Sequence, residues 1–224
     1  MHVIKISDEA ATAADRDTVG GAAYLSSNDE YPTCRWCCTE MALFLQLDIR
    51  EEFDLPFHSG SHLLLFMCPT HNEIPAIYYG KALLPEEFWN KNDGHYALIL
   101  LPPGSSNIVH RLDPYIASKK LTFNRVNERV DTLEEFSYGT HDFKIGGVPG
   151  WINYSVDASC PCGGSMRFIC QIPDGFGFRQ TESAPEQPDS FSSTEYCLFL
   201  GNQVYVLGCD RQCNSRAVIA ACDN

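Results

Sequence analysis

The sequence predicts an α+β fold that is mostly β and internally duplicated, with pseudo-twofold halves and few short helices. Two observations lead to this prediction. Most apolar runs are short, rich in β-branched, aromatic and leucine residues, and broken by glycine and proline, which is typical of strands. Three ordered blocks of the first half also recur in the second half, which indicates a repeat.

The elements are expected in the following order. The first strand, at 3–7, alternates apolar and polar residues. Further strands are expected at 41–48, 62–68, 95–101, 121–126, 166–172, 196–200 and 203–209. Short helices are expected near Glu9–Asp15 and near Pro85–Asn90, where proline opens a turn and acidic residues follow.

The repeat sets the expected domain boundary. The matched blocks are 20–24 with 146–151, 34–48 with 160–173, and 64–68 with 205–209. A Pro/Gly/Ser stretch at 102–107 leads toward the second copy. We therefore expect a first repeat at 1–112 and a second at 113–224, packed as one compact unit.

Two residue types keep the same place in each copy. Met41 and Gln46 of the first copy correspond to Met166 and Gln171 of the second. Because side chains alternate along a strand, we expect each methionine to face the core and each glutamine to face the other side and bond to backbone.

Composition and charge exclude several classes of protein. The 224 residues are 44% hydrophobic and 20% charged, which is ordinary globular usage. Apolar runs are far shorter than the roughly 18 residues of a membrane helix, and the first residues lack a signal-peptide pattern, so we expect a cytoplasmic protein. The net charge of −13 argues against nucleic acid or an anionic membrane as partner and favours a basic protein.

Cysteine spacing is the strongest chemical signal. Eleven cysteines in such a chain are expected as metal ligands or buried thiols rather than disulfides. Four Cys or His residues, supplied as two pairs at turns, complete a tetrahedral zinc site. We predict one or two structural zinc ions, the first bound by Cys34, Cys37, Cys68 and His71, and the second by Cys160, Cys162, Cys209 and Cys213.

Three points about these ligands stay open. Cys38 could replace Cys37 in the first site. The pair Cys160-x-Cys162 is tighter than the usual chelating pair. All of these cysteines could instead be small buried thiols.

No residue is expected to be catalytic. A zinc ion with four protein ligands has no open position for water, and the pairs Gly20-Gly21 and Gly146-Gly147 lack phosphate-binding patterns. We therefore expect a protein that is not an enzyme, although an enzyme of unrecognised type remains a third class.

The repeated motifs resemble a known family. Residues 146–151 (Gly-Gly-Val-Pro-Gly-Trp) and 162–173 are similar to motifs of the YwqG-like proteins, a bacterial domain of unknown function that is similar to programmed-cell-death-2-like proteins. The first copy departs by having Ala22-Ala23-Tyr24 in place of the Pro and Trp. The resemblance implies a β-rich, doubled domain without an established active site. Bacterial members are often encoded beside polymorphic toxins as immunity proteins, and the eukaryotic relatives imply a chaperone role for a nascent ribosomal protein.

Two functions follow from the charge and the resemblance. The first is an immunity protein that binds and neutralises a cognate, cytoplasm-acting bacterial toxin; the alternative is a chaperone or adaptor for a basic client such as a ribosomal protein. The loop Arg179–Thr194 is the insertion that separates the copies, and long loops are often functional. The expected partner-binding residues are Phe176, Phe178, Glu182, Glu186, Asp189 and Phe191, with an inert surface loop as the alternative.

Overall fold

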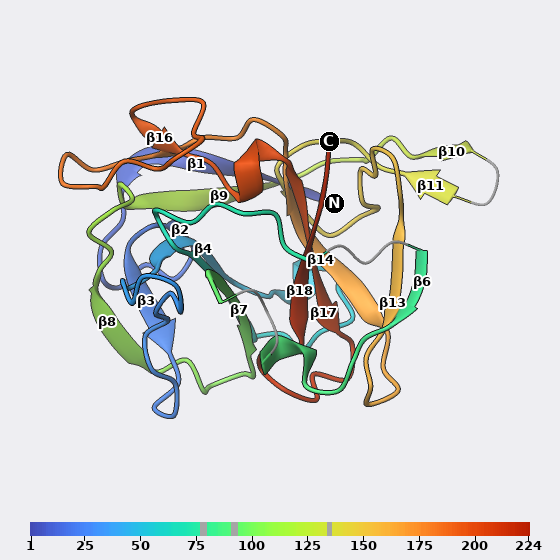
Figure 1. The fold of residues 1–224 in the computed structure, drawn as a ribbon. Coiled ribbons are helices and arrows are strands. Elements are labelled where there is room, and N and C mark those ends of the chain that lie inside the picture. Colours follow the sequence, from blue (N-terminus) through green and yellow to red (C-terminus); the bar gives the residue numbers. More distant parts are fainter. Residues whose placement is uncertain (77–79, 91–93, 134–135) are drawn as a thin grey trace.

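Ten strands form one continuous, curled sheet at the centre of the protein (Figure 1). The structure is a computed structural model that describes residues 1–76, 80–90, 94–133 and 136–224. All neighbouring strands of this sheet are antiparallel. In order across the sheet they are β18 (Val218–Asp223), β17 (Gln203–Cys209), β14 (Met166–Ile172), β12 (Lys144–Ile145), β1 (His2–Ala10), β9 (Lys119–Arg125), β2 (Thr18–Val19), β4 (Ala42–Asp48), β5 (His62–Met67) and β7 (Tyr96–Leu101).

Shorter elements surround this sheet. Four two-stranded sheets pair β3 (Ala22–Leu25) with β8 (Ile108–Leu112), β6 (Gly80–Leu83) with β13 (Val156–Ser159), β10 (Asp131–Leu133) with β11 (Phe136–Tyr138), and β15 (Phe178–Arg179) with β16 (Glu195–Tyr196). The single-turn 3-10 helices are η1 (Glu51–Phe53), η2 (Phe88–Asn90) and η3 (Phe199–Gly201). The mostly β prediction is confirmed, and no helix in the described ranges is long and apolar enough to cross a membrane.

Both predicted helices and one predicted strand are corrected. The chain at Glu9 continues β1 as far as Ala10, which pairs with Lys119 of β9, and a turn follows in which Asp15 accepts the Thr12 N–H. Only the single turn η2 forms at 85–90, and the strand expected at 196–200 ends at Tyr196 because the chain then enters η3. In these places strand pairing and turn geometry outweigh the helix or strand propensity of the local sequence.

Strand β1 lies in the middle of the sheet, between β12 and β9, two strands from later in the chain. Figure 1 shows β1 beside β9. Its Ile4 pairs with Phe123 of β9, and on the other side His2 pairs with Ile145 of β12. The two outermost strands approach each other as well, since the Leu100 N–H of β7 donates to the carbonyl of Ser215, just before β18, at 2.7 Å. The sheet is therefore nearly closed.

Apolar side chains pack on both faces of the sheet. On β5, Leu63 and Leu65 point into the main core, whereas Leu64 and Phe66 point into a satellite core that also holds Cys34 and Cys68. A second satellite core contains side chains of β14, β17 and β18 together with Cys160 and Cys209. Each satellite core thus ends at one of the predicted cysteine groups.

A β-bulge corrects the expected orientation of the repeated glutamines. The register of β4 shifts between Leu43 and Leu45, so that Phe44 and Leu45 both reach the main core. Gln46 consequently points to the same side as Met41 rather than the opposite side. It does bond to backbone as expected, since its amide accepts from the Tyr24 N–H and donates to a neighbouring carbonyl. The register of β14 shifts in the same way between Phe168 and Cys170.

Candidate metal centres

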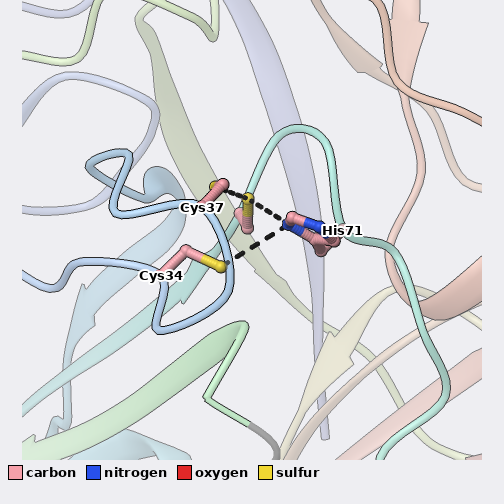
Figure 2. A group of neighbouring side chains, drawn as sticks. Cys34, Cys37 and His71 are labelled. Carbon is pink, nitrogen blue, oxygen red and sulfur yellow. Dashed lines mark hydrogen bonds between the residues drawn. The ribbon is translucent and has the colours of Figure 1, made fainter.

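The first cluster forms where two loops meet at the end of the first satellite core. Cys34 and Cys37 belong to the turn before β4, Cys68 directly follows β5, and His71 lies one turn later. Figure 2 shows Cys34, Cys37 and His71 converging from these loops. One ligand atom from each of the four side chains lies within 4.8 Å of the others.

The distances in this cluster suit a single tetrahedral ion. With bonds of about 2.3 Å to sulfur and about 2.0 Å to nitrogen, a tetrahedron separates two sulfurs by about 3.8 Å and a sulfur and a nitrogen by about 3.5 Å. The Cys37 and Cys68 Sγ atoms are 3.6 Å apart. The His71 Nδ1 atom lies 3.6 Å from Cys34 Sγ and 3.3 Å from Cys68 Sγ. The four side chains are therefore already arranged around one point.

The second cluster has the same construction from four cysteines. Cys160 and Cys162 belong to the turn before β14, Cys209 ends β17, and Cys213 follows in the next turn. The Sγ atoms of Cys160 and Cys213 are 3.6 Å apart, and those of Cys162 and Cys209 are 3.4 Å apart. The tight Cys160-x-Cys162 pair therefore does not prevent four sulfurs from converging.

The two chelating turns share one backbone device. In the first, Cys38 donates its N–H to the Cys34 carbonyl and adopts a left-handed φ of 58°. In the second, Gly163 donates to the Cys160 carbonyl with a φ of 83°. Cys38 thus takes the turn position that favours glycine, and its exposed side chain lies outside the cluster. The ligand beside it is Cys37.

Burial and hydrogen bonds give the thiols of each cluster contrasting acidities. Burial raises the pKa of Cys34 and of Cys160 to about 11. Burial also acts to raise the pKa of Cys37, but hydrogen bonds from the side chain and backbone of Thr39 outweigh it and lower this pKa to about 6. For Cys162, hydrogen bonds likewise outweigh burial and lower the pKa to about 7. One thiol at the same turn position of each cluster is thus predisposed to the thiolate form that binds metals.

The arrangement can hold one metal ion per cluster and leaves no ligand position open for a reacting water. Cys37, Cys162 and Cys213 are exposed, so they are not small buried thiols. Outside the two clusters, Cys170 and Cys222 are fully enclosed, and burial raises the pKa of Cys170 to about 12. Such a thiol is unreactive at neutral pH.

The predicted partner-binding residues are placed differently from one another. Phe178 is fully buried against Phe44, so it cannot contact a partner, and Phe176 is partly buried against the main core. Phe191 is 73% exposed. The three acidic residues, Glu182, Glu186 and Asp189, are exposed on the loop 179–194. The prediction that Phe178 binds a partner is therefore wrong, because its ring is part of the core.

Sequence reasoning missed a partly buried polar network. Asp48 accepts hydrogen bonds from Arg16 and from His62 Nδ1, the latter at 2.8 Å, and the His62 side chain is fully buried. Thr70 was missed as well; its Oγ1 lies 3.3 Å from Cys68 Sγ. The network has no sequence motif because it joins residues far apart in the chain.

Comparison of the sequence with protein-family models and with curated proteins finds no match.

Proposed function

We propose that the protein is an immunity protein of the YwqG-like family that binds and neutralises a basic, cytoplasm-acting toxin, and that two structural zinc ions hold its ligand loops. Zinc is favoured because the ligand sets, three cysteines with one histidine and four cysteines, are those of structural zinc sites. A protein that binds a toxin without catalysing a reaction agrees with metal clusters in which protein side chains fill every ligand position.

We also propose that the chain arose by internal duplication. β4, which directly follows Met41, and β14, which begins with Met166, are each third from an edge of the sheet, and each carries a bulge at the corresponding position. Gln46 accepts the N–H of Tyr24, and Gln171 accepts that of Gly150, its counterpart in the repeat. These matched contacts support a pseudo-twofold relation between the halves.

The observation that carries the immunity proposal is the loop 179–194. Buried Gln187 anchors it by accepting the Cys197 N–H and donating to the Cys197 carbonyl, and Tyr196 donates to the Pro185 carbonyl. The anchored loop nevertheless presents Phe191, an apolar ring, in a groove of about 540 Å³ that also includes Glu186. An exposed aromatic anchor with a nearby carboxylate is suited to a basic partner.

The test is to co-express a toxin encoded next to this protein with wild-type protein and with Phe191→Ala, measuring growth and co-purification. We expect the substitution to weaken the complex at least about tenfold, as for a hot-spot residue. Ile108→Ala is the matched control because Ile108 is an apolar side chain, 42% exposed on β8, outside the loop. No protection by the wild-type protein would refute the immunity function and leave the chaperone or adaptor as the alternative, to be tested with a basic ribosomal client.

A further inference from the structure

A second groove lies beside the second cysteine cluster. It has a volume of about 450 Å³, within the range of ligand sites. Its lining residues come from two distant segments, Glu86, Glu87 and Trp89 from the turn around η2, and Pro161 and Cys162 from the chelating turn.

The first segment is held firmly against the second. β6 and β13 run parallel, with Leu83 opposite Ser159, and the next N–H, of Leu84, donates to the Ser159 carbonyl at 2.9 Å. Phe88 is buried in the same satellite core as Cys160. The groove is therefore shaped by core packing, backbone hydrogen bonds and the cysteine cluster itself.

The lining combines an aromatic ring with carboxylates. Trp89 is half-buried, and its ring packs edge-on against Phe88 with 4.9 Å between ring centroids. Glu86 and Glu87 are exposed, and Glu87 is steadied by a hydrogen bond from Asn90. None of the described lining residues is basic; Arg211 donates to the Cys162 carbonyl but does not line the groove.

We propose that this groove binds an arginine side chain of a basic protein partner, an inference that rests on the proposed protein-binding function. A guanidinium stacks on indole rings more readily than an ammonium does and pairs with carboxylates. The arginine stem would lie on Trp89 and Pro161, with its charge beside Glu86 and Glu87. The net charge of −13 attracts a basic partner over long distances, and the groove then supplies the local contact.

The test uses the metal-loaded protein and a fluorescent peptide of alternating arginine and glycine, with binding measured by anisotropy at low salt and at physiological salt. Glu86→Gln/Glu87→Gln should weaken binding about tenfold, and Trp89→Ala by about fivefold or more. The matched control Glu51→Gln/Glu52→Gln removes the same charge from another exposed pair of neighbouring glutamates. This control should bind the peptide as the wild type does.

Three results would contradict the inference. If both glutamate-pair variants lose the same peptide affinity, bulk charge alone attracts the peptide. If Trp89→Ala has a wild-type circular dichroism spectrum and binds the peptide as wild type does, the groove is not used. A lysine–glycine peptide that binds more tightly than the arginine one would contradict the choice of arginine. If a groove variant neutralises the toxin as strongly as the wild type does, the groove has no part in immunity, although it can still bind arginine. If the groove binds the peptide but the protein neutralises no toxin, the immunity function is refuted and the arginine site stands.

Discussion

Replacing Cys37 by serine should remove one metal ion, whereas replacing its neighbour Cys38 should remove none. The Cys37 Sγ lies 3.6 Å from that of Cys68, inside the first cluster. Cys38 occupies the left-handed turn position and is exposed outside the cluster. The two substitutions make the same chemical change one residue apart, so each is the control for the other.

The structure gives the expected loss of stability. Cys37 and Cys68 are 31 positions apart, and cross-linking a loop of that length stabilises a fold by about 4 kcal/mol in the chain-entropy estimate. We apply this disulfide estimate to a metal that closes the same loop. In a chain of this size 1 kcal/mol moves the unfolding temperature by about 2–4 °C, so Cys37→Ser should lower it by roughly 10 °C.

Elemental analysis and thermal unfolding of untagged protein measure both effects. Wild type and Cys38→Ser should carry two zinc ions and unfold at similar temperatures, and Cys37→Ser should carry one. Cys38→Gly should unfold at a slightly higher temperature, because glycine adopts a positive φ with little strain. Full zinc content in Cys37→Ser together with loss in Cys38→Ser would show that the ligands have been assigned wrongly, and no zinc in any variant would refute the metal sites.

Three further substitutions test other parts of the structure. Burial acts to raise the pKa of Asp48, but hydrogen bonding from His62 outweighs it and lowers this pKa well below its usual range, so the stabilisation is present above about pH 4 and is lost as the pH falls through the folded-state pKa. Denaturant unfolding should therefore show Asp48→Asn less stable than wild type at pH 7, with a gap that closes in acid; a gap independent of pH would contradict this. Gly164→Ala would place a Cβ 2.9 Å from Cys209 Sγ, so elemental analysis should find one zinc ion lost, and two retained ions would be the contrary result. Gln46→Leu leaves buried backbone groups unpaired and should cost about 2–3 kcal/mol in unfolding measurements, a prediction that fails if stability is unchanged.

The parts predicted from sequence are those that local spacing encodes. The two ligands of each chelating pair lie within a few residues of each other in the sequence. The tetrahedral geometry of the ion then limits which other residues can complete the site. The eight residues that the sequence singled out form the two clusters. The strands β4, β5, β14 and β17 are similarly local, because their apolar runs are continuous and bounded by turns.

The parts that were missed depend on distant pairing. β18 contains neighbouring alanines, which are uncommon in strands, and it forms because Ile219 and the residues around it pair with β17. Position just before a predicted loop suggested that Phe178 was a surface residue, but that ring packs against Phe44 from a strand far earlier in the sequence. The bulges that change the side of the sheet to which Gln46 and Gln171 point cannot be predicted from the alternation of apolar and polar residues. One extra residue in a strand reverses the side of every residue after it.

The central place of β1 makes the order of synthesis matter for this protein. His2 and Ile4 leave the ribosome before their partners in β9 and β12, since Arg125, Phe123 and Ile145 follow more than half a chain later. At typical ribosomal elongation rates the interval is on the order of 10 s, far longer than a hairpin needs to form. During that time β1 has two unpaired backbone edges, a state in which strands pair with other chains. A nascent copy of this protein therefore exposes β1 to other chains until the middle of the sheet can form.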